Sequence, residues 1–159
     1  GVLLLISHTV EGAMALMLNK VSQVDLATFA DEQKMECHPN IATQKVYLGG
    51  PVETGRGWVL HNQKTIAEQQ ALGPDLLLSI GVDSLKQILT IPDARLRLIL
   101  GYSGWSKGQL EKEMSEGSWI TAPFDPEMMF NTPPEKLWEV SLASLGIKPA
   151  QLISTQGIH

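Results

Sequence analysis

Four short, almost uninterrupted apolar runs constrain the fold of this chain more than any other feature of its sequence. They span residues 2–6, 13–18, 76–80 and 96–100, with turn residues on either side. Such runs are typical of strands covered on both faces. A buried helix segment gives a similar signal, but the short lengths favour strands. A membrane-spanning helix needs about 20 apolar residues, so no transmembrane helix and no membrane partner are expected.

The spacing between the runs predicts how some of the strands pair. Only residues 7–12 separate the first two runs. A parallel crossover needs about a dozen residues or more, so this pair should be antiparallel. Two further short strands are expected at residues 45–48 and 58–61, and the glycines between them indicate a loop or a wide hairpin.

Capping signals predict helices between several of these strands. The expected signals are Ser22 with Asp25, then Asp83 or Ser84, then a capping box of Ser106 and Gln109 for a helix through about Glu116, and finally Thr132 followed by two prolines. Gly146 should end the last helix. The alternation predicts one α/β domain over residues 1–159, with a mixed β-sheet and helices on both faces. Residues 45–75 are interpreted as a candidate small α+β subdomain inserted into that sheet.

Charge and cysteine content exclude several kinds of protein. The chain holds 12 Lys and Arg against 17 Asp and Glu, a formal net charge of −5, whereas a dedicated nucleic-acid surface is normally basic. Its single cysteine, Cys37, cannot form an intrachain disulfide, which is typical of a reducing cytoplasm. Neither Cys37 nor the adjacent His38 has further ligands at metal-site spacing, so no metal or cofactor is predicted. We expect a cytoplasmic protein that does not bind nucleic acid directly.

A glycine-rich segment at residues 101–108 is the most suggestive local motif. It is predicted to form a loop between the strand at 96–100 and a capped helix, a geometry that exposes backbone N–H groups to an anion. The nucleophile-elbow pattern G-x-S-x-G fails because Trp105 stands at its last glycine, so a structural turn is favoured over Ser103 as a nucleophile. At least one of the segment's three glycines, Gly101, Gly104 and Gly108, should have a positive φ or a close backbone neighbour.

Several motifs in a fixed order resemble the bacterial YqgE/AlgH family. They are HTVEGA at 8–13, Asn19, GGPV at 49–52, WVLH at 58–61, GYSGWSKGQLE at 101–111, WITAP at 119–123 and the closing helix over 133–146. The resemblance covers nearly the whole chain. It implies a cytoplasmic α/β protein of uncertain function, and some members are labelled as candidate transcriptional regulators. It also implies that other members carry a further N-terminal segment, whose strand we expect this chain to lack.

Polar and aromatic residues at predicted strand ends and in adjoining loops form the candidate site, because α/β sheets tend to bind ligands there. The candidate binding patch consists of His8, Glu11, Asn19, His61, Tyr102, Ser103 and Trp105. The chain is therefore predicted to be a binding or regulatory protein that acts through a protein or small-molecule partner.

The alternative is a small hydrolase-like enzyme that uses His61 or His8 as a base and residues 101–108 as an anion or oxyanion cradle. A hydrogen-bonded His–Ser or His–Glu pair in a deep pocket would favour the enzyme. A flat, partly apolar patch would favour the binding protein.

The segment at residues 101–108 and the turn at residues 8–11 are expected to meet at one end of the sheet. This requires the strands at 2–6 and 96–100 to run parallel, so that their C-terminal ends share an edge. His8 would then lie near Tyr102 or Ser103, with Glu11 available as a polar partner.

The isolated chain should show no specific binding to double-stranded DNA, because neutralising phosphates requires clustered Lys and Arg side chains. A mobility-shift assay at about 150 mM salt, near physiological ionic strength, checks this. A sequence-dependent shift that survives competitor DNA would contradict it.

Overall fold

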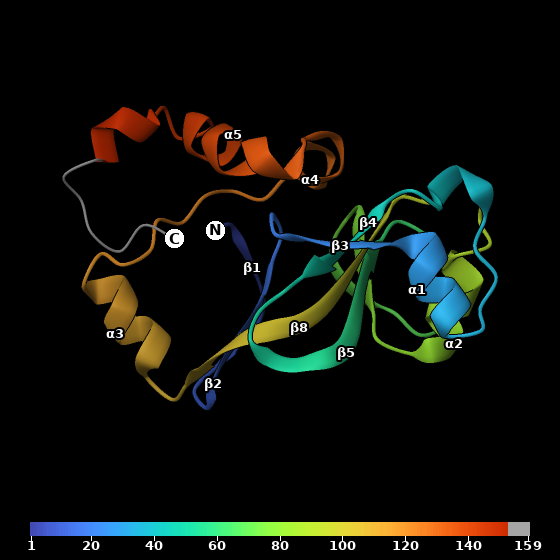
Figure 1. Ribbon diagram of the computed structural model, residues 1–159. Coiled ribbons are helices and arrows are strands. Elements are labelled where there is room, and N and C mark those ends of the chain that lie inside the picture. The colour runs from blue at the N-terminus through green and yellow to red at the C-terminus, as the bar shows by residue number, and fades with distance from the viewer. Residues whose placement is uncertain (153–159) are drawn as a thin grey trace. The chain divides into compact units, whose positions relative to one another are not determined.

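Figure 1 shows the computed structural model, which describes residues 1–152. Backbone contacts divide the chain into two compact units, and each is described by itself. Unit 1 comprises Gly1–Lys20, Gly49–Val52 and the chain from Tyr102 onward, and unit 2 comprises Val21–Leu48 and Glu53–Gly101. The long strand β8 (Leu96–Ser106) contributes its first part to unit 2 and its last part to unit 1.

Unit 1 is built on three antiparallel strands with β2 in the middle. β1 (Leu3–Thr9) pairs with β2 (Gly12–Met17), which confirms the antiparallel prediction, and β2 pairs with the last part of β8. Because β2 is antiparallel to both neighbours, β1 and β8 run parallel to each other. The helical elements of this unit are α3 (Gln109–Ser115), α4 (Pro126–Asn131), η2 (Pro134–Lys136), α5 (Leu137–Ala143) and η3 (Pro149–Leu152).

Unit 2 carries the mixed part of the sheet. β4 (Lys45–Leu48) pairs antiparallel with β3 (Val21–Asp25) and parallel with the first part of β8. β7 (Leu76–Ser79) pairs antiparallel with β5 (Val52–His61) and β6 (Gln70–Gly73). The helical elements are α1 (Leu26–Glu32), η1 (Pro39–Ile41) and α2 (Val82–Ile88). This mixed sheet with its helices confirms the predicted α/β class.

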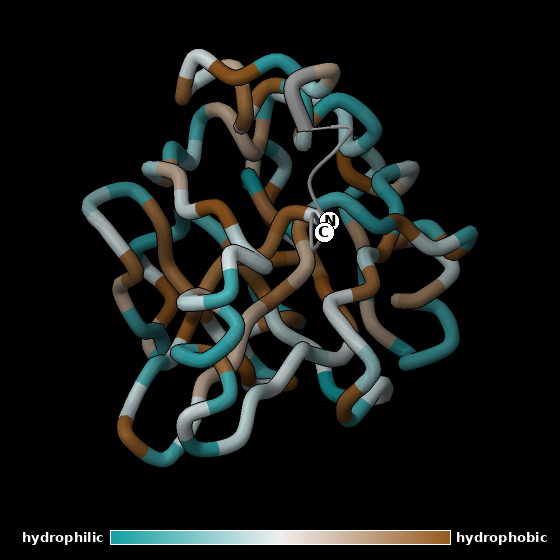
Figure 2. The backbone as a smooth tube through the Cα atoms, turned by 90° about the vertical axis from the view of Figure 1, so that its left-hand side faces the viewer, coloured by the Kyte–Doolittle hydropathy of each residue, from teal (hydrophilic) through white to brown (hydrophobic). Residues whose placement is uncertain are grey.

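The core of unit 2 explains where its two α-helices form. Leu26 and Ala30 of α1 join Leu85 and Ile88 of α2 and the strand residue Leu98 in one buried cluster. The spacing of three or four residues places each helical pair on one helix face, so each helix buries an apolar stripe. Figure 2 colours the backbone by hydropathy and shows brown hydrophobic stretches alternating with teal hydrophilic ones along the chain.

Residues 101–106 belong to a strand, so the predicted loop is wrong over most of its length. β8 continues to Ser106, and Ser103 to Ser106 pair with β2. Glycines usually weaken a strand, which is why the pattern indicates a loop, but the ladder with β2 supplies the missing stabilisation. The prediction of an unusual glycine backbone is confirmed, because φ is 78° at Gly101 and 76° at Gly108.

The C-terminal end of α5 carries the expected cap, whereas α1 begins after Asp25 and not near Ser22, which lies in β3. Asp25 caps α1, since its Oδ1 accepts a hydrogen bond of 2.9 Å from the backbone N–H of Thr28. Gly146 has a φ of 74°, and the N–H of Ile147 donates to the carbonyl of Leu142 at 3.0 Å. Both contacts satisfy backbone groups that a helix end leaves unpaired.

Three other helix starts differ from the expectation. α2 begins after Gly81, so neither Asp83 nor Ser84 is its cap. α5 begins after Lys136, because the prolines that follow Thr132 form the 3-10 turn η2 first. The N-cap of α3 is Gly108, although Gln109 reaches back to the Ser106 N–H at 3.0 Å, as in a capping box.

Three elements were not predicted: β3, β6 and α4. The apolar content of β3 and β6 is low or irregular, so no strand periodicity marks them. α4 does carry a start signal, the Asp125 cap followed by Pro126, which the predictions left out. Among the helices within residues 1–152, none combines the length and the apolar character that crossing a membrane would require.

Replacing Gly50 by Ala should destabilise unit 1. Gly50 has a φ of 153°, and an added Cβ would lie 2.3 Å from the carbonyl carbon and oxygen of Tyr102. Because backbone atoms cannot move aside as a side-chain tip can, we expect the free energy of unfolding to fall by about 2 kcal/mol or more in urea denaturation.

Gly55→Ala is the matched control, since no atom lies within 4 Å of its added Cβ. This variant should change the free energy of unfolding by less than about 0.5 kcal/mol. Equal losses in the two variants would show that the close approach of Gly50 to Tyr102 does not matter.

Candidate functional site

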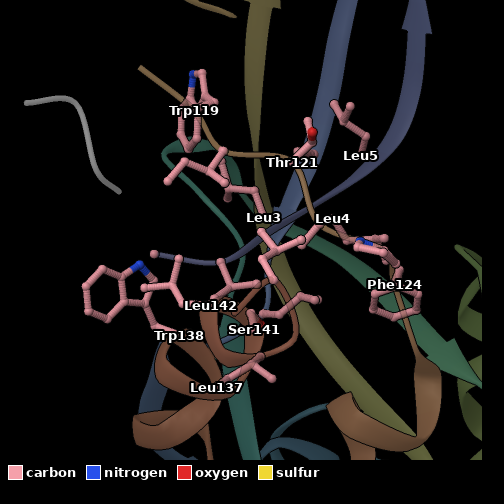
Figure 3. A pocket seen from close by; sticks show the side chains of 18 of the residues that line it. Leu3, Leu4, Leu5, Trp119, Thr121, Phe124, Leu137, Trp138, Ser141 and Leu142 are labelled. Carbon is pink, nitrogen blue, oxygen red and sulfur yellow. The ribbon is translucent and has the colours of Figure 1, made fainter. Parts of the chain in front are cut away.

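A pocket of about 470 Å³ lies entirely within unit 1 (Figure 3). Its walls come from β1, α3, α4, α5 and the connecting segment at residues 118–124. Figure 3 shows Leu3 and Leu4 of β1 near the centre of the view, with Trp119 on one side and Leu137 of α5 on the other. The pocket therefore joins strand, helix and loop residues that are far apart in the sequence.

The lining of the pocket is overwhelmingly apolar. Three tryptophans, Trp105, Trp119 and Trp138, contribute to it together with leucine, methionine, isoleucine and phenylalanine side chains. Large apolar side chains that are more than a third exposed also line it, namely Leu5, Met114, Ile120, Phe124 and Leu145. Solvent-accessible apolar surface gathered in a concavity is typical of a binding site.

One polar contact connects β1 with α3 beside this pocket. The Nε2 atom of His8, which lines the pocket, lies 2.5 Å from Oε1 of Glu111. The hydrogen bond with His8 is the main reason why the pKa of Glu111 is lowered. The expected partner of His8, Glu11, instead donates its backbone N–H to the Thr9 hydroxyl in the β1–β2 turn.

A second polar cluster orients two of the tryptophans. The indole Nε1–H groups of Trp105 and Trp119 both donate to Oε1 of Glu113, at 3.1 and 2.9 Å. Gln109 donates to the other oxygen of the same carboxylate at 3.1 Å. The two rings are nearly perpendicular, at 79°, with centroids 5.8 Å apart. A single carboxylate therefore sets the orientation of two aromatic walls of the pocket.

The remaining unit 1 residues of the predicted patch make structural contacts. Asn19 accepts a hydrogen bond from the Val2 N–H at 2.9 Å, and the Ser103 hydroxyl donates to the Gly49 carbonyl at 3.3 Å. The Tyr102 ring packs beside Gly104, at 3.4 Å from where a Cβ would stand. Of the predicted patch, only His8 and Trp105 line the pocket.

The register of the strands explains which of these residues meet. His8 is paired with Ala13, which is paired with Trp105, whereas Ser103 is in register with Ala15. Trp105 is therefore the β8 residue in line with His8 across β2. The parallel course of β1 and β8 agrees with the expected arrangement.

His61 belongs to unit 2 and is fully buried. Its Nδ1 accepts a hydrogen bond of 3.0 Å from the Gln63 N–H, so its Nε2 carries the proton. Nε2 then donates to the Ser79 hydroxyl at 2.8 Å, and that hydroxyl donates to the Glu68 carbonyl at 2.7 Å.

The direction of these bonds is the reverse of what a hydrolase needs. A catalytic base must accept the serine proton, whereas His61 donates to Ser79 and the serine proton is held by a backbone carbonyl. Residues 103–106, expected to belong to the oxyanion cradle, are paired in the sheet. Within residues 1–152, no three His, Cys, Asp or Glu side chains converge on a common metal position. The geometry does not favour the enzyme alternative.

Stability should fall as the pH drops from 6.5 toward 4, because burial lowers the pKa of His61 from 6.5 to about 4. The unfolded chain takes up the proton near pH 6.5 and the folded chain only near pH 4, so acid favours unfolding within this window. The full effect is roughly 3 kcal/mol. Urea denaturation at pH 7 and pH 5 measures the part of this effect that is lost above pH 5, about 2 kcal/mol, while most carboxylates remain ionised.

His61→Gln removes the titrating group and should give a flatter dependence between pH 7 and pH 5, whatever its stability at pH 7. His38→Asn is the matched control, because His38 only caps η1 by accepting the Asn40 N–H. The same pH dependence in His61→Gln and the unaltered chain would overturn this assignment.

The chain was compared with known protein families and with individual relatives. A family profile described as DUF179, AlgH-like, matches residues 1–150. A UPF0301 protein of Myxococcus xanthus is 37% identical over 159 residues, covering 100% of this chain and 88% of the relative. Another, from Ralstonia pickettii, is 42% identical over 154 residues, covering 94% and 80%.

Two solved structures share the fold. The solution structure of the AlgH protein from Pseudomonas aeruginosa has a TM-score of 0.76 and 34% identity, covering 99% of this chain and 85% of that one. The crystal structure of protein DIP2367 from Corynebacterium diphtheriae has a TM-score of 0.69 at 23% identity, covering 96% and 81%, and shows the fold alone. The family match over nearly the whole chain, together with these relatives, shows that the chain belongs to the AlgH-like family of UPF0301 proteins.

Proposed function

We propose that this chain is a cytoplasmic binding protein, without catalytic activity, whose unit 1 pocket holds a small molecule with an apolar body. The observation that carries the proposal is the pocket itself, with about 470 Å³ of space and a mostly apolar lining. Small-molecule sites typically enclose about 300–1,000 Å³ and combine an apolar lining with a few polar groups. His8 and Glu111 supply such polar groups beside this pocket.

The proposed gain on binding comes from removing apolar surface from water. Leu5, Ile120 and Phe124 line the pocket and are 46%, 41% and 37% exposed, so a ligand can cover surface that the fold leaves open. Each buried methylene contributes about 0.8 kcal/mol. A ligand that contacts β1, α4 and α5 together would also stabilise unit 1 by linkage, because the unfolded chain offers no such site.

If ligand binding stabilises unit 1, the ligand can control how much folded unit 1 is available to a partner, which would be a regulatory role. The net charge of −5 argues against direct contact with DNA, so regulation would pass through a ligand or a protein partner. The single Cys37 supports a cytoplasmic location.

The neutral fluorophore N-phenyl-1-naphthylamine should bind with a saturable rise in fluorescence. Three of the four tryptophans line the pocket, and the fourth, Trp58, belongs to unit 2. Excitation of tryptophan should therefore sensitise the bound fluorophore. Leu145→Gln removes an apolar lining side chain and should weaken binding by about fivefold.

Val140→Gln is the matched control. Val140 is 37% exposed, as is Leu145, and lies on α5, but it does not line the pocket. This variant should leave the affinity for the fluorophore unchanged. The absence of saturable binding, or equal weakening by both variants, would refute the proposed pocket.

A further inference from the structure

We propose that the ligand of this pocket carries a positively charged, alkylammonium-type group, which sits against the Trp105 and Trp119 rings. The proposal rests on the proposed function, because it concerns the same pocket. It assigns the chemical class of the ligand as a cationic amphiphile rather than a fatty acid or another apolar anion.

The first argument is the absence of a partner for an anion. Among the described residues that line the pocket, none is Lys, Arg, Asp or Glu, and His8 is the sole titratable side chain. Neither a carboxylate nor an alkylammonium group would gain an oppositely charged lining side chain in exchange for its lost water, but the indole faces attract only the alkylammonium group.

The second argument is the arrangement of the two indoles. Their planes meet at 79° with centroids 5.8 Å apart, an edge-to-face pair whose two rings both line the pocket. Trp has the most favourable ring face for a cation, and quaternary ammonium groups are typically recognised by such aromatic walls. A ligand cation can approach a ring face within about 6 Å without losing its attraction.

The third argument is the charge behind these rings. Both indole N–H groups donate to Oε1 of Glu113, and a hydrogen bond to an anion polarises the donor. This polarisation enriches the ring faces in electron density and strengthens their attraction for a cation. Glu111, on the same helix, adds a second carboxylate next to the pocket residue His8. The local field therefore favours a positive ligand group.

Displacement of bound N-phenyl-1-naphthylamine by three compounds with the same alkyl chain tests the charge preference. They are octyltrimethylammonium, octanol and octanoate, compared in one buffer at low salt, where charge preferences are screened least. We expect octyltrimethylammonium to displace the fluorophore at a concentration about tenfold or more below that of octanoate, with octanol in between.

Glu113→Gln keeps an acceptor for the indole N–H groups but removes the charge behind the rings. It should reduce the preference for octyltrimethylammonium over octanol, taken as the ratio of the two displacing concentrations on the same variant, by about three- to tenfold. Glu116→Gln is the matched control for net charge, because Glu116 is exposed at the C-terminal end of α3 and does not line the pocket. Trp119→Leu preserves apolar lining and should also lose the preference for the cation.

The outcomes separate the two proposals. If octanol displaces the fluorophore and octanoate does so as well as octyltrimethylammonium, the apolar pocket stands and the cationic ligand class is wrong. If Glu116→Gln lowers the preference as much as Glu113→Gln, the effect is net charge and the assignment to the two indoles is wrong. If none of the three compounds displaces the fluorophore, the proposed function itself fails.

Discussion

The small side chains of β2 are the constraint on which the rest of unit 1 depends. β2 lies between β1 and β8, and its buried residues Ala13 and Ala15 face larger neighbours across the ladder. Cross-strand partners lie on the same face of the sheet. A small side chain on that face leaves room for other side chains or a ligand to pack against the sheet. Ala15 lines the pocket, and a larger side chain there would fill part of it. The hollow is thus a consequence of the composition of β2.

The short helix α3 turns this hollow into a site with polar character. Glu111 and Glu113 are two residues apart, so they point to different sides of the helix. One reaches His8 of β1, and the other receives both indoles. Leu110, the residue before Glu111, is buried, lines the pocket and anchors the helix. A seven-residue helix has little stability of its own, so these contacts hold it in place.

The fold class and most of the strands could be predicted, because a short apolar run marks a buried strand without knowledge of its distant neighbours. β3, β6 and residues 101–106 of β8 could not. The antiparallel pairing of β1 and β2 could be predicted because too few residues connect them for a parallel crossover. The pocket could not be predicted, because it needs the contact between β1 and the segment that carries Trp119, which are far apart in the sequence. His8 illustrates the difficulty: Glu11 is three residues away, but its partner Glu111 is 103 residues away. Only the β1–β2–β8 register brings α3 to His8.

The two units use their polar groups in different ways. In unit 2, the donors of the His61 and Ser79 side chains are satisfied inside the fold, and the series of bonds ends on the Glu68 carbonyl. Such a network specifies a core and has no free capacity for a ligand. In unit 1, His8 and Glu111 are about half exposed beside an apolar hollow. A polar group can bind a ligand only where it can give up its present partner or water. The exposed His8–Glu111 pair therefore supports the proposed ligand site in unit 1, and the buried His61–Ser79 network supports a structural role in unit 2.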